Sequence, residues 1–171
     1  MKKNLTIIAA SFFMACLLTG TSLYAQQKAS PPKVSKASVN GNDITINYSS
    51  PSKKGRVIFG GLEPMGKVWR TGANEATTIE LSKDAKIGSL DMKAGKYALF
   101  TIPNETEWII IINSEPKQWG AFKYDKSKDV GRFNVPVINL DEVVERFAIE
   151  VNEAGTVSIA WDQTKVEFMI K

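Results

Sequence analysis

The strongest constraint on the fold is an alternation of apolar and polar residues in short segments that are bounded by turn residues. Successive side chains of a β-strand point to opposite faces, so this alternation is typical of half-buried strands. In segment 44–48 the apolar residues Ile44, Ile46 and Tyr48 are separated by polar ones. The Asn-, Gly- and Asp-containing cluster at 40–43 before it is typical of a tight turn.

The pattern recurs along the chain with turn residues between the segments, and no long helical periodicity interrupts it. The run 108–112 is continuously apolar and rich in isoleucine, which predicts a central strand buried on both faces. Together these features predict an all-β fold, an antiparallel β-sandwich of immunoglobulin-like or jelly-roll-like type. Further strands are expected at 34–39, 77–81, 85–87, 96–102, 132–137, 142–151, 156–161 and 165–170.

The N-terminus has the features of an export signal. Lys2 and Lys3 precede an apolar run at 5–18, and cleavage is expected near Ala25. The run is shorter than the roughly 20 residues of a membrane-spanning helix, so no transmembrane segment is expected. The sequence therefore predicts export to the periplasm or the extracellular space, with lipid anchoring at Cys16 as the alternative of lower weight.

We expect a signal peptide at 1–25, a polar, proline-bearing flexible tether at 26–33 and a single β-sandwich domain at 34–171. Two long irregular loops, 51–81 and 116–131, are expected on this domain. The sequence does not determine whether the two loops meet in space, nor the oligomeric state.

The composition excludes several classes of chemistry. The chain has no histidine and one cysteine, which lies in the expected signal peptide. Triads and dyads that use histidine, histidine-ligated metal sites and disulfides are therefore excluded, and neither a metal nor a cofactor is expected. The formal net charge of +4 is spread along the chain, so no nucleic-acid partner is expected.

The candidate binding residues lie mainly in the first loop. Arg70 offers a planar set of donors for a carboxylate, phosphate or sugar hydroxyl, and Trp69 offers a flat face. Asn74 and Glu75 would complete a polar pocket. In the alternative, structural interpretation, Arg70 and Glu75 pair internally and Trp69 caps the core.

Two further features would support such a pocket. Arg56, with Lys53 and Lys54, would form an anion-binding rim around a glycine, although a solvated turn gives the same pattern. Trp119, with Tyr124, would add a second aromatic face near the first, or form a small hydrophobic cluster under its loop.

The sequence suggests a small polar or anionic ligand of carbohydrate type, bound without catalysis; no catalytic residue is assigned. The alternative is a glycan-directed hydrolase that uses two carboxylates among Glu63, Glu75 and Asp129. It ranks second because nothing in the linear spacing places any two of them at the separation that glycosidases require. A structural or interaction domain without a small-molecule site is a third interpretation.

The motifs PSKKGRVIFGGLEPMGKVWRTGANEATTIEL, AGKYALFTIP and EWIIIIN resemble the secreted bacterial family known as domain of unknown function 2911. The resemblance covers roughly residues 30–170 and implies an exported, β-rich domain of Gram-negative bacteria with no established activity. The positions that carry it are Tyr48, Pro51, Gly55, Arg56, Trp69, Arg70, Gly72, Asn74, Glu75, Gly95, Tyr97 and Trp119.

Overall fold

The computed structural model describes residues 29–171, and the expected signal peptide at 1–25 lies outside them. The regular elements of this part are all strands, apart from one short 3-10 helix, η1, at Lys126–Lys128. This confirms the predicted all-β class. The strands are β1 (Pro32–Val39), β2 (Asn42–Ser49), β3 (Thr77–Leu81), β4 (Ala85–Ile87), β5 (Leu90–Met92), β6 (Gly95–Ile102), β7 (Glu107–Asn113), β8 (Asp129–Val151) and β9 (Thr156–Met169).

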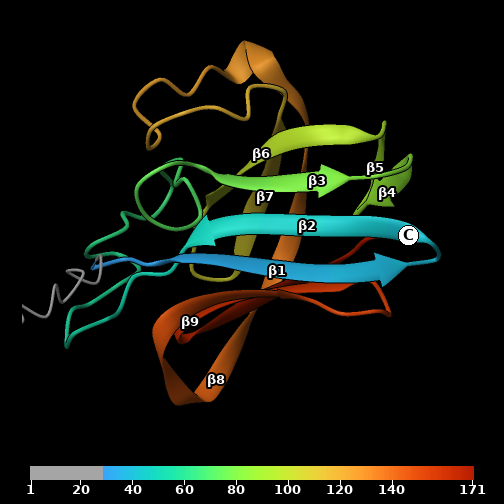
Figure 1. The fold of residues 1–171 in the computed structure, drawn as a ribbon. Coiled ribbons are helices and arrows are strands. Elements are labelled where there is room, and N and C mark those ends of the chain that lie inside the picture. The colour runs from blue at the N-terminus through green and yellow to red at the C-terminus, as the bar shows by residue number, and fades with distance from the viewer. Residues whose placement is uncertain (1–28) are drawn as a thin grey trace, which may run out of the picture.

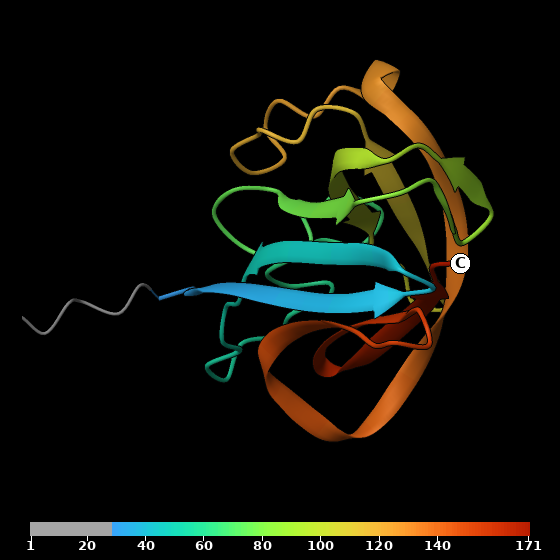
Figure 2. The same ribbon diagram turned by 45° about the vertical axis from the view of Figure 1, so that its right-hand side comes forward.

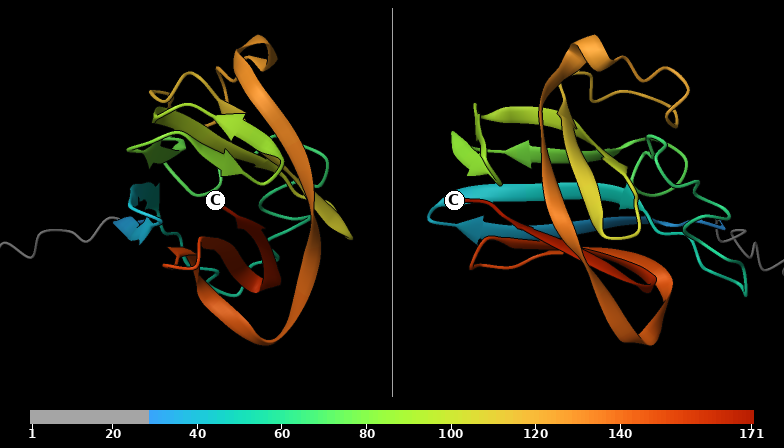
Figure 3. Two further views of the ribbon diagram at one scale, coloured as in Figure 1. Left: turned by 90° about the vertical axis from the view of Figure 1, so that its right-hand side faces the viewer. Right: turned by 180° about the vertical axis from the view of Figure 1, so that it is seen from behind.

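Seven strands form one antiparallel sheet in the order β1-β2-β3-β6-β7-β8-β9, and β4 and β5 form a separate hairpin. The sheet curls, so that the second half of β8 and β9 lie against β1 and β2 (Figures 1 and 3). The Val151 N–H at the end of β8 donates to Ser35 Oγ in β1 at 2.9 Å. The two halves of one curled sheet thereby form the two layers of a sandwich.

The expectation of separate strands at 132–137 and 142–151 was wrong, because both belong to the strongly bent strand β8 (Figure 2). Its first part pairs with β7 as far as Pro136, and its second part pairs with β9 from Val137 onward. Register shifts between Asn139 and Ala148 mark β-bulges, which bend a strand without ending it.

The expected separate strands at 156–161 and 165–170 are likewise one strand, β9. Asp162, in the predicted turn between them, has a φ of 55° and lies opposite a register shift in β8. The polar residues at this point therefore mark a bulge within the strand instead of a turn.

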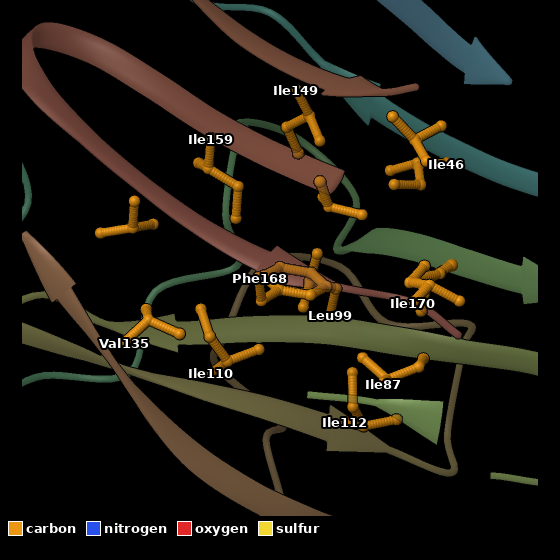
Figure 4. Close-up of a cluster of buried hydrophobic side chains, with 14 of the residues drawn as sticks. Ile46, Ile87, Leu99, Ile110, Ile112, Val135, Ile149, Ile159, Phe168 and Ile170 are labelled. Atoms are coloured by element: carbon orange, nitrogen blue, oxygen red, sulfur yellow. The ribbon is translucent and has the colours of Figure 1, made fainter. Parts of the chain in front are cut away.

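The core lies between the two layers of the curled sheet (Figure 4). Ile110 and Ile112 of β7 face this core, whereas Ile111 belongs to a second buried cluster on the opposite face of the sheet. The predicted burial of segment 108–112 on both faces is thus confirmed. The second cluster comprises Ala76, Ala98, Phe100 and Ile111, with Ala121 and Tyr124 of the second loop packed against it.

Strand β1 begins at Pro32, two residues inside the expected tether. Just before it, the Pro31 carbonyl accepts a hydrogen bond from the Ser50 N–H at 2.9 Å, which fixes this segment beside the end of β2. Within residues 29–171 no helix has the length and apolar character needed to cross a bilayer.

The closure of the core near the C-terminus depends on Gly155. Its φ is +85°, and a Cβ added there would lie 2.1 Å from the Ile170 carbonyl oxygen. Gly60 has the same φ of +85°, but a Cβ there would have no neighbour within 4 Å. A comparison of the two glycines therefore separates the energetic cost of a positive φ, which both share, from that of a steric clash, which only Gly155 has.

We predict that Gly60→Ala lowers the free energy of unfolding by about 1–2 kcal/mol, the usual penalty of a left-handed backbone for alanine. Gly155→Ala should lower it by a further ~1–3 kcal/mol, because the clash is with backbone that cannot rotate away. Urea unfolding of both variants measures the difference. Equal losses in the two variants would contradict a close approach at Gly155.

Candidate functional site

The first loop, residues 50–76, is fixed to the sheet by the backbone of Trp69. The Trp69 N–H donates to the Thr101 carbonyl at 2.7 Å, and the Thr101 N–H donates back at 2.9 Å. Trp69 therefore occupies the place beside β6 that β3 leaves free. The isolated bridge holds the middle of a long irregular segment against the edge of a regular strand.

The expectation that the Trp69 indole faces a ligand is corrected by the structure. The residue is 3% exposed, and its ring packs against Trp108, Phe147 and Trp161 in the core. The indole N–H donates to the Gly72 carbonyl at 3.0 Å, so the polar atom of the ring is satisfied internally. Trp69 therefore caps the core, which is what the alternative, structural interpretation predicted for it.

Arg70, the next residue, lines a cavity of about 450 Å³ together with Arg56 and Asn74. We call this cavity the arginine pocket. Glu63 and Lys54 also line it, so its charged side chains are three cations and one carboxylate. Three of the six predicted residues, Arg56, Arg70 and Asn74, are brought together here. The remaining lining residues are Ala29, Ser30, Pro51, Ser52, Leu62, Gly72, Ala73 and Trp161.

The Arg70 guanidinium has an unusual environment. Its Nε atom is buried and has no hydrogen-bond partner. None of the ion pairs within residues 29–171 includes Arg70, so the predicted internal pair with Glu75 does not form. A buried, unpaired donor on a charged group is costly, and proteins satisfy such groups in most cases.

Arg56 is held differently. Its Nε donates to the Lys53 carbonyl at 2.9 Å, and one terminal nitrogen donates to the Ser52 carbonyl at 2.5 Å. Lys53 itself does not line the pocket and pairs with Asp162 at 3.1 Å. The loop thus positions the Arg56 charge at the pocket, and the predicted cationic rim consists here of Lys54 and Arg56.

Glu63 is the residue that sequence reasoning underestimated, since it was named only among candidate hydrolase carboxylates. Burial raises the pKa of its carboxyl from 4.5 to about 7, although the charges of Arg70 and Arg56 oppose the rise. The Glu63 carboxyl therefore changes its charge near neutral pH. No sequence pattern reports this property, because it depends on how deeply the loop buries the side chain.

The two irregular loops meet beside the arginine pocket. The Gly120 N–H donates to the Asn74 carbonyl at 3.0 Å, and the Ala76 N–H donates to the Gln118 carbonyl at 2.9 Å. The Asn74 side-chain amide donates to the Ser30 carbonyl at 3.2 Å, so this residue ties the N-terminal segment to both loops.

Glu75 and Trp119 form an isolated bridge and line other cavities than the arginine pocket. One is an intermediate cavity of about 380 Å³ shared with Ser30 and Asn74. The other, which we call the Trp119 groove, has about 530 Å³ and extends along β1, β2 and β3. Trp119 is 61% exposed, so the predicted second aromatic face is accessible.

Asp129, one of the candidate hydrolase carboxylates, is held in a polar network under the second loop. It accepts hydrogen bonds from Tyr124 Oη at 2.6 Å, from Arg132 Nε at 2.7 Å and from Asn113 Nδ2 at 2.9 Å. Burial, and then the hydrogen bond to Asp129, raises the pKa of Tyr124 to about 12. These contacts assign Asp129 to anchoring its loop. Among residues 29–171, no group of three or more acidic or cysteine side chains could hold a metal ion.

A family model described as "Protein of unknown function (DUF2911)" matches residues 30–170, nearly all of the described chain. The chain belongs to this family. The matched DUF2911 region includes the whole sheet, both loops and every residue of the arginine pocket except Ala29. Comparisons with curated proteins and with solved structures found no match.

The raised pKa of Glu63 gives a pH dependence of stability. The folded state holds this proton more tightly than the unfolded chain, so the contribution of Glu63 to stability falls as pH rises from 4.5 to about 7 and does not change outside that window. After allowance for solvent screening, the loss is on the order of 2 kcal/mol. We predict that Glu63→Gln is more stable than the wild type at pH 8, by up to about this amount, and equally stable at pH 4.

Urea unfolding across this pH range measures the effect. Glu75→Gln, which changes an exposed carboxylate outside the pocket, is the matched control and should follow the wild-type profile. Parallel profiles for Glu63→Gln and the wild type would show that Glu63 titrates alike in the folded and unfolded states.

Proposed function

We propose that this chain binds a small anionic ligand in the arginine pocket without transforming it, and that sugar acids and related glycan fragments are the ligand class. The observation that carries the proposal is the buried Nε atom of Arg70, which lacks a hydrogen-bond partner in a residue that lines the arginine pocket. A carboxylate accepts two parallel hydrogen bonds from a guanidinium, so it would satisfy this donor and neutralise the charge together.

The surrounding charges favour an anion. Arg56 and Lys54 add positive charge at the same cavity, and their only acidic counterpart among its lining residues is Glu63. Below pH 7 the Glu63 carboxyl is largely neutral and can donate a hydrogen bond to a bound anion. Above that pH it is charged, competes for the arginines and repels the ligand. Binding is therefore coupled to proton uptake by Glu63.

The pKa of Glu63 near neutral pH also favours the hydrolase alternative, because a general acid must hold its proton at the working pH. A glycosidase needs two carboxyl groups about 5–10 Å apart, and Glu63 is the only carboxylate that lines the arginine pocket. We therefore infer binding without hydrolysis. Hydrolysis of a glycan panel that is lost in Glu63→Gln would reverse this choice.

We also infer that the pocket works outside the cytoplasm, because the Lys2–Lys3 pair and the apolar run at 5–18 have the pattern of an export signal. The N-terminal residue of the protein recovered from the exporting cell tests this inference. Recovery of the chain with Met1 in place, in the cytoplasm, would contradict it.

We predict that D-galacturonate at pH 6 stabilises the wild type against heat, and that Arg70→Met weakens its binding about 10- to 100-fold. The factor corresponds to the loss of charge-assisted hydrogen bonds worth about 1.5–3 kcal/mol. Arg70→Lys, which keeps the charge but not the planar donors, should fall between the two. The affinity of the wild type should decrease as pH rises through about 7, where Glu63 ionises.

Isothermal titration calorimetry gives the affinities, and the NMR resonance of the Arg70 Nε–H reports directly on the unpaired donor. Inorganic phosphate, used in parallel, tells whether any small oxyanion suffices. Lys86→Met is the control, because Lys86 pairs with Asp91 at 3.5 Å and does not line the pocket. Equal affinity in Arg70→Met and the wild type would overturn the proposal.

A further inference from the structure

We propose that the Trp119 groove is a second binding site, which takes a pyranose ring of an oligosaccharide and does not depend on the arginine pocket. The groove lies on the face of the sheet opposite the main core. Val34, Asn47 and Thr78 are directly opposite one another on β1, β2 and β3, so their side chains share one face and form its floor. Glu75 of the first loop and Trp119 of the second, which form an isolated β-bridge, also line the groove.

Trp119 supplies a stacking surface. It is 61% exposed, whereas Trp69, Trp108 and Trp161 are each at most 3% exposed. The backbone on both sides of it is held by hydrogen bonds to the first loop, so the indole is carried on a fixed segment. An exposed, well-positioned indole packs against the C–H face of a sugar ring while the ring hydroxyls remain free to hydrogen-bond.

Gln118, the residue before it, supplies an acceptor that the protein leaves unused. The side-chain amide nitrogen donates to Asn113 Oδ1 at 3.1 Å and to the Glu115 carbonyl at 2.6 Å. Asn113 Nδ2 in turn donates to the Asp129 carboxylate, which can only accept when it is charged. This contact fixes the orientation of the Asn113 amide, and the Asn113 oxygen then fixes that of the Gln118 amide. Gln118 Oε1 lies at the end of this series of hydrogen bonds, and it is buried without a partner.

Thr78, which also lines the groove, carries a second unpaired oxygen. The residue is 8% exposed, and its Oγ1 atom is buried with no hydrogen-bond partner. Gln118 and Thr78 both line the Trp119 groove, so two of the four buried side-chain polar atoms without partners in residues 29–171 belong to residues of this one cavity. Both lack a donor, and a sugar offers hydroxyl donors close to an apolar ring face.

The charges at the groove favour an acidic saccharide over a neutral one. Lys33, Lys96 and Lys117 line it against the single carboxylate of Glu75. Lys96 is partly compensated by Glu80 at 3.5 Å, which leaves Lys33 and Lys117 as the cations available to a ligand. A carboxylate on the bound ring or on the next ring would be attracted to them.

Tryptophan fluorescence tests this proposal, because Trp119 is the accessible indole of the four. Tetragalacturonate should change the emission and protect it from acrylamide quenching, and cellotetraose should do so at higher concentration. Trp119→Phe should abolish the fluorescence change, and Trp119→Ala should reduce the calorimetric affinity at least 10-fold. Phe122→Ala is the matched control, since Phe122 is 88% exposed on the same loop but does not line the groove.

Thr78→Val separates a binding role from a structural one. Removal of an unpaired buried hydroxyl should leave the thermal midpoint unchanged or raise it, while the affinity for tetragalacturonate falls several-fold. Unchanged affinity in both Trp119→Ala and Thr78→Val, or the absence of any fluorescence change with either oligosaccharide at tens of millimolar, would overturn the proposal.

Arg70→Met distinguishes the two sites. It should leave the affinity for tetragalacturonate in the Trp119 groove unchanged. If Arg70→Met abolishes binding and Trp119→Ala does not, the saccharide occupies the arginine pocket, and the second site is rejected while the first proposal stands.

Discussion

The burial of the Trp69 indole is the interaction on which the architecture of both sites depends. A segment with many glycines has little tendency to adopt one conformation, because each glycine loses much conformational freedom on folding. Trp69 offsets this loss through its pairing with Thr101 and through its ring, which lies among Trp108, Phe147 and Trp161. Once Trp69 is placed, the adjacent residue Arg70 lines the arginine pocket.

The second loop is placed by polar contacts in addition to apolar ones. Asp129 accepts hydrogen bonds from Tyr124, Arg132 and Asn113. Tyr124 of this network also packs against the second hydrophobic cluster. The same network orients Gln118 and thereby the backbone that pairs with the first loop. Four buried side-chain atoms in residues 29–171 remain unpaired: Arg70 Nε in the first loop, Gln118 Oε1 in the second, Thr78 Oγ1 on β3 and Trp108 Nε1 in the core. Departures from full satisfaction in an otherwise well-paired structure tend to be functional.

Local patterns in the sequence were sufficient for the strand content and for the double burial of segment 108–112, because alternation and β-branching act within a few residues. They were insufficient at β8, where bulges near Val144 bend the strand and no turn residue distinguishes a bend from an end. Trp69 shows the same limit for the site. An indole beside an arginine in a glycine-rich loop fits a ligand platform and a core plug equally well, and only tertiary packing decides. Glu63 needed the fold as well, since burial is what sets its protonation.

The position of Ser30 has a practical consequence for anyone who expresses this domain. Its carbonyl accepts from Asn74, and the residue borders both the arginine pocket and the intermediate cavity, together with Ala29. A recombinant fragment that begins at Pro32 would contain every strand of the sheet, yet it would lack the part of the cavity wall that Ala29 and Ser30 form. A folded fragment of this kind would therefore still have an incomplete cavity wall.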